Sequence, residues 1–463
     1  MASFADYDGD GYLDCYLVTN ILDFSKSPLG QRDYLLHNNG NGTFTDVSKT
    51  AGIWGLTQGH SAVWFDANQD GWPDIYVAND FETPERFYLN KGDGTFIDVV
   101  DERLPHVAYF SMSADSGDLN NDGLIDFMVA DMRDHTRQAY MDGMEEVGRG
   151  LWEMERVTEL IPQYIWSAVY LGTGTDRYQE AAHLTGMDAT GWTWSTRIAD
   201  LDNDGRQDVF VTTGMIRNFI DPDIVDKQNV APTLAARAGV WKNALPRRER
   251  TIAYHNLGDL KFADVSAAWG LDHQGISFGC ALVDLNHDGN LDIVFVNQDG
   301  PPTVIRNDTA TGHSVEFKLA GHAPNRDGIG AELHLETASG TQVRQLYTER
   351  GTVTSELPIV HFGLGNDTTI KKLTIRWPLG EVQVLENLQA DCLYTIAEPE
   401  FPAGQRPHRA PAVLKAPTDR SLYVETAHQH GLDYTSAAQP FDEFFRQRLL
   451  PRRLGQQIGR AHV

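Results

Sequence analysis

The sequence predicts an all-β fold in which a β-propeller of about five blades precedes a small β domain. Three observations lead to this fold class. A nine-residue acidic motif occurs five times, and each copy runs directly into a short apolar segment typical of a strand. Aromatic segments followed by Asn/Gly turns recur between the copies. From His313 onward, apolar and polar residues alternate with the period of two that is typical of half-buried strands.

The acidic motif, D-x-[D/N]-x-D-G-x-x-D, has the chemistry of a calcium-binding loop. Side chains at alternate positions of a tight turn converge on one point, and glycine at position 6 lets the backbone reverse. Hard carboxylate oxygens suit Ca²⁺, which takes about six to eight oxygen ligands, whereas Mg²⁺ keeps more of its own water. We expect about five Ca²⁺ sites, with side-chain ligands at positions 1, 3, 5 and 9 and a backbone carbonyl at position 7. The candidate ligands are Asp6, Asp8, Asp10, Tyr12 and Asp14; Asp66, Asn68, Asp70, Trp72 and Asp74; Asp118, Asn120, Asp122, Leu124 and Asp126; Asp200, Asp202, Asp204, Arg206 and Asp208; Asp284, Asn286, Asp288, Asn290 and Asp292.

These loops differ from EF-hands, which need a bidentate Glu at position 12 and flanking helices. Position 12 is occupied by Leu17, Val77, Val129, Val211 and Phe295. The apolar segments that follow the loops predict buried strands at 15–18, 75–78, 127–130, 209–212 and 293–296. One acidic motif alone can be an ordinary surface turn. Five copies in the same strand–loop–strand context favour calcium-loaded β-hairpins instead.

The repeat is larger than the loop. An aromatic strand such as 34–38 or 87–90 is followed by an Asn/Gly turn and a Gly-x-Phe-x-Asp-Val segment, and a related unit begins at Ile252. Four strands per unit are typical of propeller blades. Insertions at 131–163 and 217–250 lengthen the later blades, either as a helical cap or as binding loops. Trp192 and Trp194 precede the fourth loop, where they pack in a blade core or form a sugar-stacking platform.

Composition excludes several classes of function. The 463 residues carry a net charge of −27, which opposes binding to nucleic acids and to anionic membranes. No segment is long and apolar enough to predict a transmembrane helix. The three cysteines give no disulfide framework, and we expect Cys15 and Cys280 to be buried as small apolar side chains.

The ends of the chain look incomplete. Met1 lies five residues before the first loop, within an expected strand, so we expect the original N-terminus to be missing. Residues 1–311 form the predicted propeller and 312–398 the β domain, in which 325–328 read as a structural turn rather than a ligand site. A proline-rich linker at 399–419 leads to an incomplete segment at 420–463. The last six residues back-translate to a common sequencing adapter, so we expect them to be non-biological and unpacked.

The five loops resemble the FG-GAP/VCBS repeats of integrin α-type propellers. Residues 313–396 are similar to an ASPIC/UnbV domain, through 325–331, the His-Phe-Gly-Leu-Gly segment at 361–365 and the Ile-Arg-Trp-Pro-Leu-Gly segment at 375–380. Together they resemble the cartilage acidic protein-like family, which includes large exported bacterial proteins. The resemblance implies a seven-bladed propeller with roughly two blades upstream of Met1, and a second propeller-like region beginning near 421. It supplies no catalytic residues.

Two classes of function remain after these exclusions. The first is a non-enzymatic, exported binding or adhesion protein, whose calcium-rigidified propeller presents loops to an extracellular protein or glycan. Its location is extracellular, periplasmic or at the outer-membrane surface, because extracellular calcium keeps such sites filled. The alternative is a hydrolase-like enzyme or an electron-transfer partner on the same scaffold. No catalytic or cofactor motif supports this alternative, although a site assembled across blades escapes a sequence reading.

Overall fold

The computed structural model describes residues 1–20, 30–81, 83–136, 161–218, 221–298, 300–309 and 311–400. All of them belong to one compact unit, Met1–Leu414. The predicted linker and the final segment lie outside the described residues, apart from 399–400. Most of the insertion at 131–163 lies outside them as well. The described chain is built mainly from strands, which confirms the all-β fold class.

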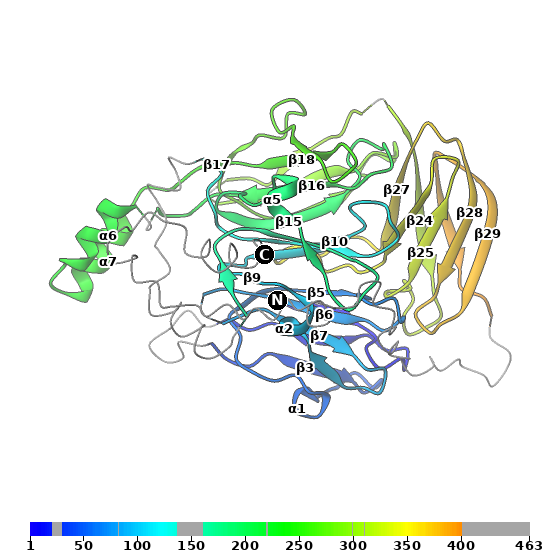
Figure 1. Ribbon diagram of the computed structural model, residues 1–463, viewed down its shortest axis with the longest axis horizontal. Coiled ribbons are helices and arrows are strands. Elements are labelled where there is room, and N and C mark those ends of the chain that lie inside the picture. Colours follow the sequence, from blue (N-terminus) through cyan, green and yellow to red (C-terminus); the bar gives the residue numbers. More distant parts are fainter. Residues whose placement is uncertain are drawn as a thin grey trace, which may run out of the picture. The chain divides into compact units, whose positions relative to one another are not determined.

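Five consecutive antiparallel sheets form the first part of the chain (Figure 1). The strands of the first two sheets are β1 (Ala2–Ala5), β2 (Asp14–Leu17), β3 (Tyr34–Asn38) and β4 (Phe44–Asp46), then β5 (Gly59–Phe65), β6 (Asp74–Asn79), β7 (Arg86–Asn90) and β8 (Phe96–Asp98). The third sheet contains β10 (Ser113–Gly117), β11 (Asp126–Ala130), β13 (Ala168–Leu171) and β14 (Gln179–Glu180). The fourth contains β15 (Thr193–Ala199), β16 (Asp208–Thr213), β18 (Ile252–Asn256) and β19 (Phe262–Asp264), and the fifth β21 (Ser277–Val283), β22 (Asp292–Asn297) and β23 (Thr303–Ile305).

Each sheet is one blade, and the acidic loop joins its first strand to its second. The second strand always begins at the position 9 aspartate, one residue before the predicted apolar segment, so the five predicted strands are confirmed as β2, β6, β11, β16 and β22. The first strands of neighbouring blades lie against one another, β1 beside β5, β5 beside β10, β10 beside β15 and β15 beside β21. The strands β5, β10 and β15 follow one another in Figure 1. The innermost strand of every blade therefore faces a common centre.

Aromatic side chains fill the space between blades. The ring of Phe127 lies 5.4 Å from that of Phe65, 4.8 Å from Tyr76 and 4.7 Å from Tyr170, and all four side chains are fully buried. Fully burying an aromatic or aliphatic side chain of this kind contributes about 1.5–3 kcal/mol. The aromatic residues that recur along the sequence are therefore the packing layer between adjacent sheets. Cys15 and Cys280 are buried as predicted.

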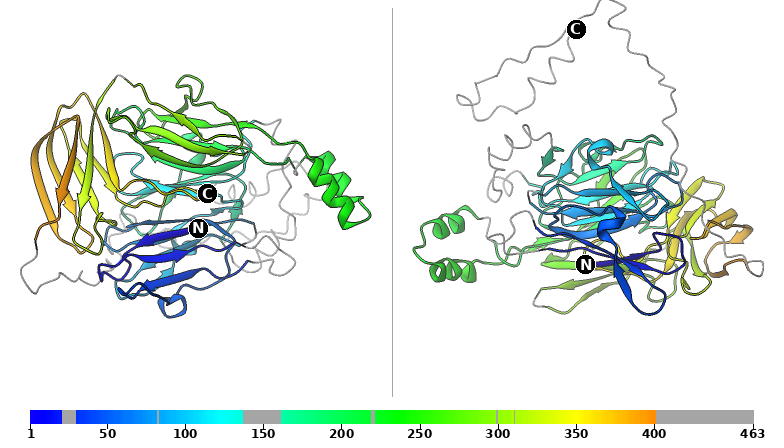
Figure 2. Two further views of the ribbon diagram at one scale, coloured as in Figure 1. Left: turned by 180° about the vertical axis from the view of Figure 1, so that it is seen from behind. Right: turned by 90° about the horizontal axis from the view of Figure 1, so that it is seen from below.

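Short elements decorate the blades. Two-stranded ladders join β9 (Val107–Ala108) to β12 (Gln163–Tyr164) and β17 (Glu249–Arg250) to β20 (Gln274–Gly275). The helices in the described part of the chain are α1 (Ser48–Ala51), α2 (Val100–Arg103), α5 (Ala182–Thr185), α6 (Pro222–Asn229) and α7 (Leu234–Asn243). The Asp221 and Thr233 side chains cap the N-termini of α6 and α7. These two helices pack on each other as a hairpin that projects away from the strands (Figure 2), so the insertion at 217–250 is helical without covering the blades.

The second part of the chain is a β sandwich of two sheets. One sheet has the order β27 (Ile359–Gly365), β24 (His313–Ala320), β30 (Cys392–Ala397), with β24 and β30 parallel. The other has the order β26 (Thr341–Gln345), β25 (Glu332–Glu336), β28 (Thr369–Arg376), β29 (Val382–Gln389). Phe317, Leu333 and Trp377 are fully buried in its core. The predicted turn at 325–328 is structural, because the Asn325 amide bonds to both the N–H and the carbonyl of Ile329.

Candidate metal-binding loops and the docking loop

The fourth loop shows how the sequence builds one candidate metal site. The carboxylate of Asp200, at position 1, accepts hydrogen bonds from the backbone N–H groups of Asp204 at 3.2 Å and Gly205 at 2.8 Å. The N–H of Arg206 donates to the position 5 carboxylate of Asp204 at 2.8 Å. Gly205 has a φ of +92°, a conformation that favours glycine, which explains the residue at position 6.

The other four loops repeat this hydrogen-bond pattern. In each, the N–H groups of positions 5 and 6 donate to the position 1 carboxylate, and the N–H of position 7 donates to the position 5 carboxylate. Position 4 has a positive φ in all five copies, between 55° and 72°. The five sequence motifs therefore fold into five copies of one geometry.

Position 9 ties each loop to its blade. Asp208 accepts hydrogen bonds from the N–H of Leu201, at position 2, and from the N–H of Asn256, at the end of β18. The equivalent aspartates Asp14, Asp74, Asp126 and Asp292 make the corresponding pair of bonds. Protein hydrogen bonds therefore fix both ends of each candidate site to strands without the help of an ion.

The donor set fits a cation. Carboxylate oxygens of Asp6, Asp8 and Asp14 all lie within 4.8 Å of one another, and the same holds for Asp200, Asp202 and Asp204. Burial raises the pKa of Asp6 to about 7 and that of Asp14 to about 8, with repulsion from neighbouring carboxylates adding to the effect. Burial likewise raises the pKa of Asp126 to about 8 and that of Asp208 to about 6. Buried carboxylates that repel one another are the environment a divalent cation relieves.

The loops divide into two types at position 3. The second, third and fifth loops have asparagine there, and its side-chain amide donates to the position 5 carboxylate at 2.8 to 3.0 Å. The first and fourth loops have aspartate, and each is approached by a histidine from the third strand of its blade. His37 Nδ1 lies 3.1 Å from Asp8 and 3.2 Å from Asp14, and His255 Nδ1 lies 3.1 Å from Asp208. The extra carboxylate is thus accompanied by an imidazole that could serve as a metal ligand.

A loop of the β sandwich, residues 346–357, reaches the innermost strand of every described blade; we call it the docking loop. Glu349 accepts from Phe4 N–H in β1 at 3.4 Å, and the Gly351 carbonyl accepts from Ser61 Oγ in β5 at 2.5 Å. Arg350 Nε donates to Asp115 in β10 at 2.6 Å. Glu356 forms an ion pair with Arg197 in β15 at 2.6 Å. It also accepts a hydrogen bond from the N–H of Leu282 in β21 at 2.7 Å.

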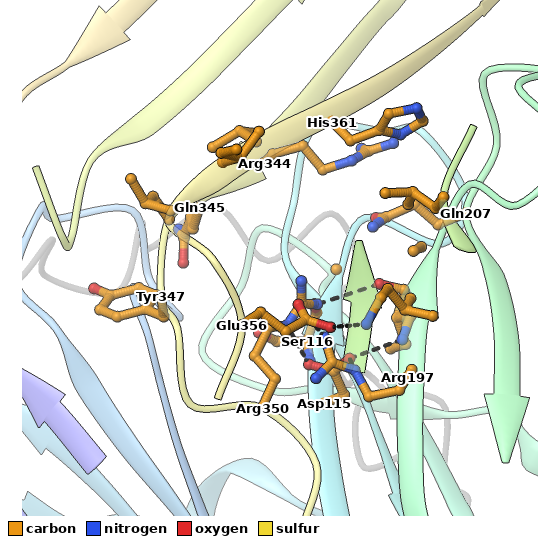
Figure 3. Close-up of a pocket in the computed structure, with 18 of the residues that line it drawn as sticks. Asp115, Ser116, Arg197, Gln207, Arg344, Gln345, Tyr347, Arg350, Glu356 and His361 are labelled. Carbon is orange, nitrogen blue, oxygen red and sulfur yellow. Dashed lines mark hydrogen bonds and ion pairs between the residues drawn. The ribbon is translucent and has the colours of Figure 1, made fainter. Parts of the chain in front are cut away.

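Beside the docking loop lies a cavity of about 120 Å³ with both cationic and acidic walls (Figure 3). Burial lowers the pKa of Arg344 to about 10, partly offset by the charges of Asp200 and Asp118. Burial also lowers the pKa of His361 to about 4, so its imidazole is neutral at pH 7. His361 Nε2 donates to the Gly289 carbonyl at 3.1 Å, which leaves Nδ1 as a buried acceptor. Arg344 of the sandwich and Asp200 of the fourth loop both line this cavity.

Sequence reasoning missed the docking loop and the histidines. The docking loop shows no motif, because its partners are as much as 345 residues away. The two histidines do leave a signal, since each precedes the recurring asparagine at the end of a third strand and accompanies aspartate at position 3. Trp194 is half-buried, packs 4.7 Å from the Phe278 ring and donates from Nε1 to the Gly214 carbonyl. It lies between blades, as the blade-packing alternative predicts.

Among the described residues, helices are too short and polar to cross a bilayer. No match to a curated protein is found. Two solved structures are similar only at low level. A biofilm matrix protein of V. cholerae, Bap1, is 12% identical over 84% of this chain and 67% of that one, with a TM-score of 0.26. Rhamnogalacturonan lyase YesW is 14% identical over 83% of this chain and 54% of that one, with a TM-score of 0.23.

Family models match the two parts of the chain separately. FG-GAP-like repeats match residues 6–77 and 66–129, which contain the first three acidic loops. The model described as ASPIC and UnbV matches residues 321–403, which cover most of the β sandwich. Membership of the cartilage acidic protein-like group stays a prediction. The chain is therefore a protein with FG-GAP-like repeats and an ASPIC/UnbV domain.

Proposed function

We propose that this protein is an exported, calcium-binding propeller that binds or adheres to an extracellular protein or glycan without catalysing a reaction. The observation that carries the proposal is the fivefold repetition of one loop geometry, in which carboxylates at positions 1, 5 and 9 are held around a point by backbone N–H groups. Like charges held this close repel one another, and a bound cation neutralises them.

Calcium suits this donor set better than magnesium. Carboxylate and amide oxygens at positions 1, 3, 5 and 9, with the carbonyl of position 7, supply enough oxygen ligands for Ca²⁺, while Mg²⁺ demands a smaller octahedral shell. The ion is structural in this proposal. It binds the folded loop and not the unfolded chain, so it stabilises each site by about 2.7 kcal/mol at a hundredfold excess over its Kd.

Export follows from the same argument. Extracellular modules of this kind bind Ca²⁺ with Kd values of about 10⁻⁴–10⁻³ M, which extracellular calcium fills and resting cytosolic calcium does not. The net charge of −27 keeps the protein soluble and disfavours nucleic acid as a partner. The repeated blades form a rigid scaffold, and connecting loops on such a scaffold are where recognition residues lie.

Thermal melts test the calcium proposal. The full chain is thermally unfolded in millimolar Ca²⁺, in the same concentration of Mg²⁺ and in chelator, all at the same ionic strength. We expect the midpoint temperature to be highest in Ca²⁺ and similar in Mg²⁺ and chelator. Coincident Ca²⁺ and chelator curves would mean that the loops are ordinary acidic turns.

A binding screen tests the adhesion proposal. The calcium-loaded chain is applied to glycan and extracellular-protein arrays, and in parallel to a panel of hydrolase substrates. Saturable binding to an array member without turnover is the expected result. Calcium-dependent turnover of any substrate would replace this proposal by the enzymatic alternative.

A further inference from the structure

The second to fifth acidic loops are linked to one another by side chains at position 4. Gln69 Nε2, in the second loop, donates to the carbonyl of Gly123, position 6 of the third loop, at 2.6 Å. Asn121 Nδ2, in the third loop, donates to the Gly205 carbonyl of the fourth at 2.9 Å. Asn203 Nδ2, in the fourth loop, donates to the Gly289 carbonyl of the fifth at 3.2 Å. Each link joins the same two positions of adjacent loops.

A second set of hydrogen bonds joins the same loops in the opposite direction. Asn256, at the end of β18, donates its Nδ2 to the Leu119 carbonyl, position 2 of the third loop, at 2.8 Å, while its own N–H binds Asp208. Asn307 reaches the Leu201 carbonyl of the fourth loop in the same way. In the third blade, where glycine replaces this asparagine, the Tyr178 hydroxyl reaches the Ala67 carbonyl of the second loop at 3.1 Å. The second to fifth loops are thus bonded in both directions.

The first loop is joined more weakly. Its position 4 residue is Gly9, which has no side chain to donate to the second loop. The return bond is present, because Asn90 Nδ2 donates to the Tyr7 carbonyl at 2.8 Å. The first loop therefore shares one link with its neighbour where the later loops share two.

These links lie where an ion would act. Position 4 stands between the candidate ligands at positions 3 and 5, so an ion bound there fixes the backbone that carries the donating amide. The accepting carbonyl at position 6 belongs to the peptide just before the position 7 carbonyl, a candidate ligand of the next loop. An ion in one loop therefore orders a peptide that the next ion needs, and the second ion loses less conformational entropy on binding.

We propose that the second to fifth loops bind Ca²⁺ cooperatively, with Gln69, Asn121 and Asn203 as the coupling residues and the first loop more nearly independent. This inference rests on the proposed calcium function. It adds a regulatory property, because coupled sites fill over a narrower range of calcium concentration than five separate sites. The coupling is reciprocal, so loss of an ion from one loop weakens its neighbours by the same factor.

The test is a Ca²⁺ titration of the full chain, by calorimetry and by equilibrium dialysis, comparing Asn121→Gly with the unaltered protein. Asn121 is exposed and has a φ of +55°. Glycine keeps that backbone conformation and reproduces the residue found in the first loop. The matched control is Asn387→Gly, the same substitution at a φ of +56° on the exposed strand β29 of the sandwich.

We expect the unaltered protein to bind about five ions with a Hill coefficient above 1. Asn121→Gly should bind the same number of ions with a lower Hill coefficient and a midpoint raised about fivefold, the lower end of typical coupling. Asn387→Gly should leave the titration unchanged. Absence of Ca²⁺ binding in the unaltered protein would overturn the calcium proposal itself. Binding with a Hill coefficient of 1, or equal titrations for the two variants, would overturn only the coupling, as would loss of one ion in Asn121→Gly.

Discussion

The guanidinium of Arg197, in β15, is fully buried and lies 2.6 Å from a carboxylate oxygen of Glu356 in the docking loop. Its second acidic neighbour, Asp115, is 3.5 Å away. Burial alone would lower the pKa of Arg197, but the charges of Glu356 and Asp115 outweigh it and raise the pKa above its usual value. Where the sandwich meets the blades, the buried positive charge of Arg197 is therefore stabilised by the carboxylates of Glu356 and Asp115.

Glu356→Gln removes the negative charge that pairs with Arg197 while keeping an oxygen for the Leu282 N–H. Breaking one side of a buried ion pair costs about 3–5 kcal/mol, so we expect the free energy of unfolding in Ca²⁺ to fall by about 3 kcal/mol. Urea denaturation measures the loss. Asp308→Asn is the control, because Asp308 and its partner Arg306 are about two-thirds exposed and such pairs contribute little. Equal losses in the two variants would show that Glu356 does not fasten the docking loop.

Gly351→Ala tests the close fit of the docking loop. A Cβ at Gly351 would lie 2.5 Å from Ser195 Oγ and 3.1 Å from the Thr196 carbonyl oxygen. Gly270→Ala is the matched control, since Gly270 has nearly the same φ, +70° against +67°, and no atom within 4 Å of the new Cβ. We expect both variants to lose about 1 kcal/mol from backbone strain, and Gly351→Ala to lose roughly 1–3 kcal/mol more from the clash. Limited proteolysis of the docking loop should accelerate in Gly351→Ala alone; identical melts and cleavage rates would contradict the fit.

Asp131, at the start of the insertion after β11, gives the structure a pH dependence. Burial raises the pKa of Asp131 to about 7, although the N–H groups of Phe110 and Tyr109 donate to it. The folded state therefore holds a proton that the unfolded chain releases near pH 3.9. Stability from this group is present below about pH 4 and is lost as the pH rises to about 7. Asp131→Asn should flatten the stability profile, measured in chelator, between those pH values; an unchanged slope would show that Asp131 is ionised when folded.

Asp204→Ala tests one metal loop individually. Asp204 is the position 5 carboxylate of the fourth loop, and it also contacts Arg206. With Ca²⁺ at about a hundred times Kd, loss of the site should remove about 2.7 kcal/mol of stabilisation, in addition to any loss seen in chelator. Asp272→Ala changes an exposed aspartate outside the loops. The difference in its stability between Ca²⁺ and chelator should equal that of the unaltered protein. A Ca²⁺-independent loss in Asp204→Ala would assign the effect to the Arg206 contact instead.

Local patterns in the sequence predicted the parts of this fold that local physics determines. The apolar segments after the acidic motifs became the second strand of each blade, because the position 9 aspartate both ends the loop and starts the ladder. The alternation of apolar and polar residues that begins at His313 is the strand β24, which starts at that residue. The repeated glycine of the motif has the positive φ that the turn requires. In each case the signal lies within about ten residues of its consequence.

Non-local contacts were not predictable in this way. The docking loop carries ordinary polar residues, and its contacts reach strand residues that lie between 74 and 345 positions away in the sequence. The links between loops depend on one side chain at position 4, which is Gln69, Asn121 or Asn203 in three loops and Gly9 in another. The sequence does not show that adjacent loops lie side by side, which is what brings each of these amides to a carbonyl of the next loop. The calcium ions, the export and the partner stay predictions.

The reach of the docking loop also sets an order of events in folding. The contact between Phe4 and Glu349 closes 345 residues of chain, and the same loop also contacts the innermost strands β5, β10, β15 and β21. At about 5–20 residues per second, roughly 20 to 70 s separate the synthesis of these two residues. Until then, the blades can pair their own strands but have no partner at their common edge. We therefore expect the sandwich to join the described blades last during synthesis, because contacts of such long sequence separation form slowly.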